Sequence, residues 1–436
     1  MFIAKVKACK KITWRVALAL TLALPTAVSA APLTIDKLLE AASRHPAVEM
    51  SELAAKEGEL RVGQAGAALY PKLSIFAKGE SYNSPTNLRP MPPTEVNVAA
   101  GDSLPFSREI LRYGLSLEAP LYVGKVYRLR EKMRFLAKKS AIAHQINLIS
   151  RQAAVLSLAS GYQALSQLED AVRARLKSLA TTRDTVHLKV QNGRTPEAEL
   201  LKIDNSVIAL KEQENDLAVK RIDIRRDLEK FTGLEVADPV KLELTGATDS
   251  GELIGLKLEE AELGAQKKEL ERARAGRYPT LSLYGTVSGN DGTAYNTDEH
   301  ISRDYNFVGL MIKMPLYDRS VGADIDLARI GEEKEEKKLA KTRIELTALE
   351  KNLKARLPVV GESMSLAQQA EANNRELLKI ARLSYEGGRT TTEEYLRYEA
   401  QLLDSQAALA RARDEKWQIC AKQAVLYGID LRGVVK

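Results

Sequence analysis

Two blocks of this sequence occur twice, and the duplication limits the folds that the chain can adopt. The block Pro-Leu-Tyr at 120–122 recurs at 315–317, and the block Gly-Arg-Thr at 193–195 recurs at 388–390, in both cases 195 positions further along. Two separate blocks with one offset indicate a duplicated unit, because both contain the Pro or Gly residues that punctuate a fold. The sequence therefore predicts one body built from two copies of a structural unit.

The first 30 residues have the layout of a secretory signal peptide. Five basic residues precede an apolar run at 16–24 that is too short to span a bilayer as a helix, and an Ala-x-Ala-like cleavage site ends at Ala30. Without these five residues the 65 Lys and Arg fall to 60 against 58 Asp and Glu, so nucleic-acid binding loses its main support. Cys9 lies in the leader, so the predicted mature chain keeps one cysteine, Cys420, and has no internal disulfide. No cysteine stands at the predicted cleavage site to carry a lipid.

Helical periodicity predicts two long helical hairpins. In the first unit, helices at about 126–189 and 197–231 flank a turn, and in the second unit helices at about 323–385 and 393–427 do the same. A helix of some sixty residues is on the order of 90 Å long. Pro358 is expected to kink or break the longer helix of the second hairpin, together with the nearby Gly361.

Before each hairpin, two segments alternate between apolar and polar residues, as β-strands do. The predicted strands lie at about 72–84 and 110–122 in the first unit and at about 280–289 and 305–317 in the second. About ten residues are enough for a tilted strand to cross the apolar core of a bilayer. Four strands cannot close a barrel, so strands in a membrane would require several chains; three chains would supply twelve strands.

No catalytic or cofactor site is recognisable in the sequence. The four histidines have no metal-ligand spacing, Cys420 has no obvious base, and the Gly-containing segments match no phosphate-binding loop. We therefore predict a protein that is not an enzyme and that uses no metal or other cofactor.

The order of these parts resembles that of the TolC-like outer-membrane efflux protein family. The matching marks are the Tyr-Pro-x-Leu-Ser strand starts at 70–74 and 278–282, the two Pro-Leu-Tyr strand ends and the two helix turns, which together extend over about 33–429. The resemblance implies a homotrimeric outer-membrane channel with a periplasmic helical extension. It would serve as the exit duct for small molecules or a secreted polypeptide, with a periplasmic adaptor and an inner-membrane transporter as partners in a tripartite pump or a type I secretion system.

The predicted fold is mainly α with a membrane β-barrel portion. It consists of two structural repeats, each a β-hairpin plus a long helical hairpin, and the trimer joins a 12-stranded β-barrel to a 12-helix α-barrel. The chain divides into a signal peptide at 1–30, a first repeat at 31–234, a linker at 235–255 and a second repeat at 256–436. Neither the cargo nor the identity of the pump follows from the sequence.

The resemblance also implies a gate where the helical hairpins turn. By position, Tyr385 matches the gate tyrosine of the family, Glu199 its acidic partner in the first hairpin, and Glu394 the first acidic ring in the second. The family's prototype has aspartate at both acidic positions. Local chemistry offers an alternative, because the first turn of any helix favours a carboxylate and a tyrosine can be ordinary helix packing. Threefold symmetry would place six carboxylates near a narrow mouth, which would favour cations.

The chain departs from the family at the next gate positions. The gate arginine would fall on Thr390, with Arg389 one position earlier, and the second acidic ring falls on Arg397. Arg397 follows Glu394 by three residues and could neutralise it through an i,i+3 ion pair.

The turns themselves are predicted from glycine and threonine. Gly193 and Gly388 suit the left-handed conformation that ends a helix, and Thr195 or Thr390 can cap the helix that follows. The resemblance adds contact with the adaptor as a second role for these turn residues and for Arg194.

One alternative from another class stays open at this point. A soluble periplasmic coiled-coil adaptor or scaffold would share the helical hairpins, and the charged run at 332–338 fits it as a water-facing stretch of helix. Such a protein would not require two pairs of strands with exposed loops, which favours the channel.

Overall fold

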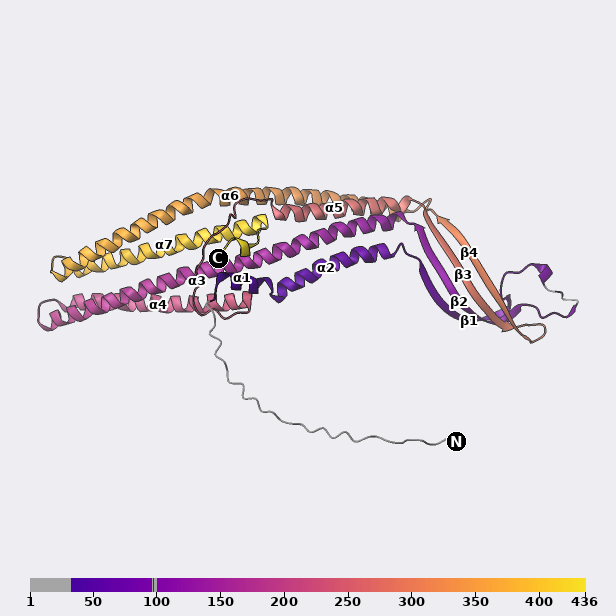
Figure 1. The fold of residues 1–436 in the computed structure, drawn as a ribbon, viewed down its shortest axis with the longest axis horizontal. Helices are drawn as coiled ribbons and strands as arrows, with labels where there is room; N and C mark the ends of the chain where they lie inside the picture. The colour runs from indigo at the N-terminus through magenta and orange to yellow at the C-terminus, as the bar shows by residue number, and fades with distance from the viewer. Residues whose placement is uncertain (1–32, 96, 98–99) are drawn as a thin grey trace, which may run out of the picture. The chain divides into compact units, whose positions relative to one another are not determined.

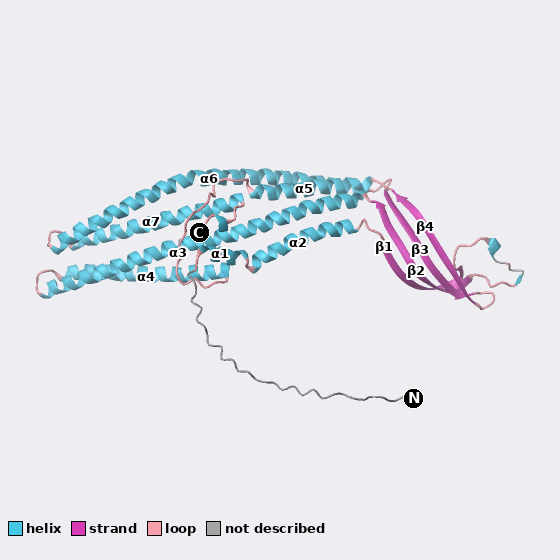
Figure 2. Cartoon of the chain, in the orientation of Figure 1, coloured by secondary structure: helices cyan, strands magenta, loops and turns pink. Residues whose placement is uncertain are grey.

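The computed structural model describes residues 33–95, 97 and 100–436. The predicted signal peptide therefore lies outside the described residues. Thr34–Lys436 form one compact unit in which helices predominate and four strands form a single sheet (Figures 1 and 2). The helices are α1 (Ile35–Ser43), α2 (Pro46–Ala67), α3 (Gly124–Gln191), α4 (Glu197–Thr232), α5 (Ile254–Arg274), α6 (Arg319–Glu386) and α7 (Thr392–Tyr427), and the strands are β1 (Lys72–Asn87), β2 (Phe106–Tyr122), β3 (Thr280–Thr293) and β4 (His300–Lys313).

In each half a helix of 21 or 22 residues, α2 or α5, precedes two strands and two long helices, and the first half begins with the additional α1. The long helices of the two halves have equal lengths, 68 residues in α3 and α6 and 36 residues in α4 and α7. The predicted mainly helical fold with a smaller β portion is confirmed. Each helix in the described ranges is too polar or too short to cross a membrane.

The four strands form one antiparallel sheet in the order β1-β2-β3-β4. The ladder between β2 and β3 joins the two halves of the chain and pairs, for example, Ser116 with Thr286. The strands contain 14 to 17 residues, against the ten or so expected from the alternation. They extend beyond the alternating segments because both hairpins continue to pair towards their loops.

The register gives the sheet one apolar and one polar face. Directly paired residues point to the same side, and Leu73 pairs with Leu117 while Ile75 pairs with Leu115. The apolar face carries Leu73, Ile75, Leu111, Tyr113, Leu115, Leu117, Leu281, Leu283, Val287, Val308, Leu310 and Ile312. Ile75 is 84% exposed and Ile312 is 74% exposed, so within the described part of the chain nothing covers this face.

In β4 apolar residues occupy consecutive positions, and the pairing decides which of them share a face. Val308 pairs with Gly285 and belongs to the apolar face, whereas Phe307 pairs with Thr286 and lies on the polar face.

The second Pro-Leu-Tyr block is not part of a strand, unlike the first. β4 ends at Lys313, four residues before the predicted end, because it has only β3 as a neighbour and β3 begins at Thr280, the partner of Lys313. In the first half, β2 continues to Tyr122 because β3 pairs with it as far as Leu281. The two blocks therefore leave the sheet differently.

The sequence predicted a kink or a break at Pro358; α6 is uninterrupted there, so the break is wrong. Figure 1 shows α6 bowed along its length. Proline removes one helix hydrogen bond, and packing can offset this cost. Leu353 and Val360, on either side of Pro358, are buried against Ile419 and Leu426 of α7.

α3 packs against α2, α4, α5 and α7 and forms the centre of the helical part. One apolar cluster joins α3 and α4 to α7 and contains Leu165, Ala171, Val172, Leu179, Leu210, Leu217, Tyr395 and Leu403. The first hairpin is thus held to the second mainly through the contact between α3 and α7.

The sequence suggested that the charged run at 332–338 is a water-facing stretch of helix, but the run also forms an ion pair with a neighbouring helix. Lys338 of α6 forms an ion pair of 2.7 Å with Glu259 of α5, and the Glu259 side chain is only 12% exposed. The run also contributes Glu335, which pairs with Lys338 at 3.0 Å. The charges therefore join two helices.

Gly114 marks a place where β2 approaches β3 too closely for any side chain. A Cβ atom there would lie 2.1 Å from the carbonyl oxygen of Val287 and 2.7 Å from the Cα atom of Ser288, both backbone atoms. We expect Gly114→Ala to lower the free energy of unfolding by about 1–3 kcal/mol, as overpacking does. The midpoint of thermal unfolding, followed by circular dichroism in detergent, measures the change. Gly79→Ala in β1 is the matched control, since a Cβ atom there meets nothing within 4 Å; equal midpoints for the two variants would contradict this account of the sheet.

Candidate functional site: the turns of the two helical hairpins

Both hairpins turn through a left-handed glycine, as predicted. The φ angle is 65° at Gly193 and 71° at Gly388. After each glycine the chain donates a hydrogen bond back into the preceding helix, from Arg194 N–H to the Lys189 carbonyl (2.8 Å) and from Arg389 N–H to the Ser384 carbonyl (2.8 Å). These bonds satisfy carbonyl groups that the end of a helix leaves without a partner. The turns are therefore built by the backbone.

Neither Thr195 nor Thr390 caps the following helix, so that prediction is wrong. α4 begins after Pro196, which has no side-chain acceptor to offer. α7 begins after Thr391, whose Oγ1 accepts a hydrogen bond from Glu394 N–H (3.2 Å), while the Glu394 carboxylate accepts one from Thr391 N–H (3.3 Å). This reciprocal capping box was visible in the sequence as Thr-x-x-Glu.

The capping box decides the position of Glu394. The Glu394 carboxylate accepts from Thr391 N–H at the start of α7. The ion pair with Arg397 that the spacing suggested does not form. The Arg397 guanidinium lies 5.6 Å from the centre of the Tyr398 ring and forms no ion pair among the described residues. The i,i+3 spacing permitted the pair, but the backbone of Thr391 is the nearer partner for the carboxylate.

Tyr385 and Glu199 are linked through Thr392, a residue that the sequence analysis did not single out. The Tyr385 hydroxyl lies 3.2 Å from Thr392 Oγ1, and the Thr392 hydroxyl lies close enough to the Glu199 carboxylate to lower the pKa of its carboxyl. Because a carboxylate can only accept, this arrangement lets Thr392 donate to Glu199 while it accepts from Tyr385. The link joins the end of α6 to the starts of α7 and α4, and thus connects the two hairpins.

The surroundings of Glu199 favour its charged form. The Thr392 hydroxyl and the Lys202 ammonium group, 3.0 Å away, hold the pKa of the Glu199 carboxyl below its usual range. Lys202 follows Glu199 by three residues on the same helix. The acidic residue is therefore charged at neutral pH but locally neutralised.

The other predicted gate residues are not drawn into this link. Arg194 and Arg389 are exposed, and Thr195 and Thr390 are half-buried. The side chains of these four residues form no hydrogen bond or ion pair within the described part of the chain. They lie at the tips of the hairpins and leave both arginines accessible.

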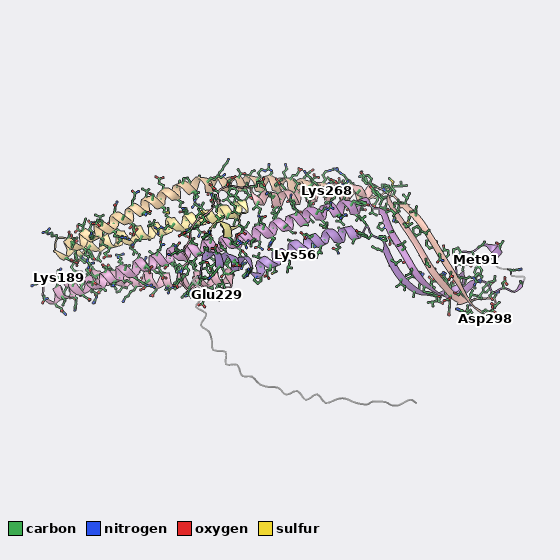
Figure 3. All side chains as sticks on the ribbon, viewed as in Figure 1. Lys56, Met91, Lys189, Glu229, Lys268 and Asp298 are labelled. Carbon is green, nitrogen blue, oxygen red and sulfur yellow. The ribbon has the colours of Figure 1, made fainter. Side chains whose placement is uncertain are left out.

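The Tyr385 ring is also packed, as the alternative proposed. It stacks on the Tyr395 ring with a separation of 4.8 Å between centres and an angle of 13° between planes. Lys189 of α3, labelled in Figure 3 near the end of the hairpin, has its Nζ 5.7 Å from the centre of the Tyr385 ring. Packing and hydrogen bonding thus coexist at Tyr385.

A buried polar cluster lies on the same face of α7, one helical turn beyond Tyr395. Glu399 is 3% exposed, and its Oε1 accepts hydrogen bonds from Ser178 of α3 (2.7 Å) and from the Tyr395 hydroxyl (2.8 Å). Burial raises the pKa of Tyr395, so its hydroxyl remains a donor. Arg175 of α3 lies near Glu399, and burial lowers the pKa of its guanidinium. The sequence carried no signal for Ser178.

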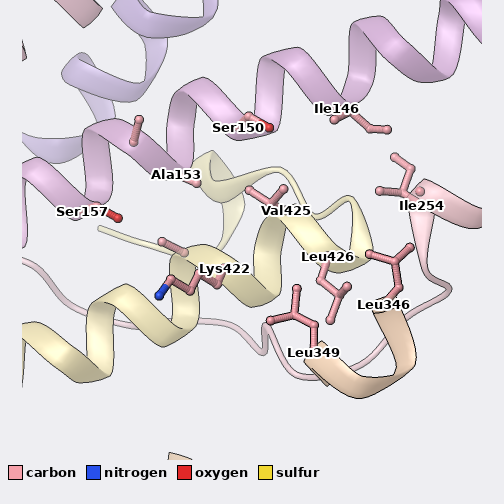
Figure 4. Close-up of a pocket in the computed structure, with 13 residues that line it drawn as sticks. Ile146, Ser150, Ala153, Ser157, Ile254, Leu346, Leu349, Lys422, Val425 and Leu426 are labelled. Carbon is pink, nitrogen blue, oxygen red and sulfur yellow. The ribbon is translucent and has the colours of Figure 1, made fainter. Parts of the chain in front are cut away.

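A cavity of about 450 Å³ lies where α7 ends and α5 begins, between α3 and α6 (Figure 4). Its lining is almost entirely aliphatic: Ile146, Ala153, Ile254, Leu346, Leu349, Val425 and Leu426. Lys422 is the one charged residue that lines it. Ser150 and Ser157 add hydroxyl groups to the lining, which contains no Asp, Glu, His or Cys. No group of acidic, His and Cys residues in the described ranges could hold a metal ion.

Residues 256–422, from α5 to most of α7, match the outer membrane efflux protein family. The sequence has no significant match among curated proteins. The resemblance to outer-membrane efflux proteins that the sequence predicted is confirmed, and the matched family consists of transport proteins rather than enzymes.

Solved outer membrane channels share the fold of almost the whole chain. The CmeC channel of Campylobacter jejuni is 15% identical, with a TM-score of 0.76, and the match covers 91% of this chain and 86% of CmeC. VceC of Vibrio cholerae is 15% identical, with a TM-score of 0.71 and coverage of 91% and 96%. MtrE of Neisseria gonorrhoeae, solved in an open state, is 16% identical, with a TM-score of 0.71 and coverage of 91% and 89%.

We expect Glu399→Ala to destabilise the contact between the hairpins. The substitution removes the acceptor that the hydroxyls of Ser178 and the buried Tyr395 share, and a buried donor left unpaired costs about 1–3 kcal/mol. Thermal unfolding of the purified protein measures the loss. Glu362→Ala removes an exposed carboxylate of α6 that has no partner in the described part of the chain and serves as the control. If both substitutions shift the midpoint equally, the buried cluster does not hold the hairpins together.

Proposed function

We propose that this chain, which has the fold of outer membrane channels and an outer membrane efflux protein region in its second half, is the outer-membrane exit duct of a tripartite pump. The observation that carries the proposal is the uncovered apolar face of the sheet. Val308 is 72% exposed and Ile75 is 84% exposed, and both lie among other apolar side chains on strands long enough to cross a bilayer. Lipid is the solvent that such a face requires.

The edges of the sheet argue for a homotrimer. β1 and β4 each have a neighbour on one side only within the described residues. An open edge is not tolerated in lipid, because its backbone groups would lack partners. Three chains joined from β4 of one to β1 of the next would supply twelve strands. Closed membrane barrels have about eight strands or more, so twelve are enough.

The two faces of the sheet then have separate roles. The face with Ser74, Ser116 and Thr286 is polar and would line a water-filled lumen. The helices would continue the duct into the periplasm, where the hairpin turns would meet a periplasmic adaptor and, through it, an inner-membrane transporter. The cargo would be small toxic molecules or a secreted polypeptide, and the leader would direct export without a lipid anchor.

The link from Tyr385 through Thr392 to Glu199 would keep the periplasmic end closed. It ties the second hairpin to the first at the turns, so opening would require this chain of hydrogen bonds to break. The exposed Arg194 and Arg389 at the tips would be the first groups that an adaptor meets. The position of Glu394 in a capping box argues against a free acidic ring at that residue.

Fractionation tests the membrane assignment. We expect the protein to stay with outer membranes after carbonate washing and to run as a trimer in mild detergent, because only closure of the sheet between chains satisfies its edges. Analytical ultracentrifugation of the detergent complex gives the number of chains. Recovery as a soluble monomer would support the soluble adaptor or scaffold instead, although that reading leaves the apolar face of the sheet exposed to water.

Single-channel recording tests the gate. Tyr385→Phe removes the hydroxyl that bonds to Thr392 while it keeps the stacked ring, and we expect a higher conductance of the closed trimer in planar bilayers. Tyr398→Phe is the matched control, because the Tyr398 hydroxyl has no hydrogen-bond partner in the described part of the chain and its ring lies near Arg397. A conductance of Tyr385→Phe equal to that of the control would show that the Tyr385 hydroxyl does not help to hold the channel closed.

A further inference from the structure

The loop between β1 and β2 begins by folding over the polar face of the sheet. Its first residue, Leu88, is fully buried and packs against Ile110, Ala294 and Ile301. The register places Glu80, Ile110, Gly292 and Ile301 in one row across the four strands, so Ile110 and Ile301 lie on the same face as the polar residues. Leu88 therefore covers this face at the end of the sheet far from the helices.

Arg112 fastens the loop to the sheet. Its Nε donates to Glu80 of β1 (2.7 Å), its Nη1 donates to the Leu88 carbonyl (2.6 Å) and to Asn290 of β3 (3.0 Å), and its Nη2 donates to the Asn87 carbonyl (3.1 Å). Asn290 is 1% exposed and in turn donates to the Arg303 carbonyl of β4 (3.1 Å). The guanidinium group of Arg112 thus connects β1, β2, β3 and the start of the loop, and Asn290 extends the connection to β4.

The start of the loop reaches the far edge of the sheet through the Arg89 side chain. Arg89, two residues after the end of β1, donates to the Asp304 carbonyl of β4 (3.1 Å). β1 and β4 are separated by three strand spacings, which is about 14 Å. The crossing takes place on the polar face, because Leu88 and the Arg112 contacts precede it there.

The returning arm of the loop is bound to the second half of the chain. Leu104 N–H donates to Asn296 Oδ1 (2.9 Å), and Asn296 Nδ2 donates to the Asp102 carbonyl (3.1 Å). Ser103 Oγ lies 2.8 Å from Thr297 Oγ1. Met91 and Asp298, labelled in Figure 3, mark the two loops at this end. Both arms are therefore anchored to the segment between β3 and β4 or to those strands.

We propose that these two arms, Leu88–Arg89 and Asp102–Leu104, form an exit strap that narrows the outer opening of the duct and limits the size of the solutes that leave it. The inference rests on the proposed function, because it takes the polar face of the sheet as the lumen. The strap is fixed by the apolar packing of Leu88 and by hydrogen bonds in both arms. It sets a size limit at the opposite end of the chain from the helix turns.

Thiol labelling from outside the cell tests the strap. Ser116→Cys places a thiol on the polar face, on β2 and farther from the loop than Arg112, and Leu115→Cys places one on the apolar face. Cys420 is 2% exposed and burial raises the pKa of its thiol, so it contributes little background. A small charged maleimide is compared with a maleimide on a bulky polyethylene glycol chain, which reaches the lumen only through the outer opening.

We expect the small reagent to label Ser116→Cys in the full-length trimer and the bulky reagent to be excluded. Arg112→Gln with Leu88→Ser releases the first arm, and Ser103→Ala with Asn296→Ala releases the second; either pair is expected to admit the bulky reagent. Arg108→Gln is the control on the same strand, since Arg108 is exposed and forms no ion pair or hydrogen bond in the described part of the chain. Retention of the trimer and of labelling by the small reagent shows that each variant is folded.

The outcomes separate the strap from the proposed function. If the bulky reagent labels Ser116→Cys at the same rate with the strap intact and with the strap released, the strap does not limit the size of solutes. This holds whether the shared rate is fast or slow. If the small charged reagent labels Leu115→Cys and not Ser116→Cys, the polar face is not the lumen and the proposed function itself fails.

Discussion

The hydrogen-bond ladder between β2 and β3 is the connection on which the other features depend. It joins the two halves of the chain into one sheet, and its register aligns Leu117 with Gly285 and Ser116 with Thr286. A shift of one residue would bring polar side chains of one hairpin onto the apolar face of the other. The close approach at Gly114 leaves no room for such a shift. The separation of an apolar from a polar face therefore follows from this one pairing.

Much of this arrangement was predictable from the sequence because it depends on local chemistry. Helix periodicity, strand alternation and the left-handed glycines at 193 and 388 all concern neighbouring residues. The exact end of β4 was not predictable, because it depends on where the partner strand begins. The continuity of α6 at Pro358 likewise depends on packing against α7, which no local pattern reveals.

The candidate site likewise combines features that depend on neighbouring residues with features that depend on distant ones. The capping box at Thr391 and Glu394 is a local motif that the sequence displays, although the predicted cap was the neighbouring Thr390. The contacts of Thr392 with Glu199, and of Ser178 with Glu399, join residues that are 193 and 221 positions apart. Such contacts arise only when the hairpins pack against each other. The resemblance to a family identified Tyr385 and Glu199 as a pair, but not the threonine that connects them.

The contacts that hold the chain together differ between its middle and its ends. Between α3 and α7 the hairpins share buried aliphatic side chains such as Leu179 and Leu403, which lose contact with apolar neighbours if the helices separate. At the turns and at the strand loops the connections include hydrogen bonds of partly exposed groups, such as those of Glu199 with Lys202 and of Arg112 with Glu80, besides the small apolar cluster around Leu88. Water can replace a hydrogen bond at a net cost of only about 0.5–1.5 kcal/mol. Rearrangement at the two ends therefore costs less than separation of the hairpins, and a duct built from this chain would change its width there while its wall stays intact.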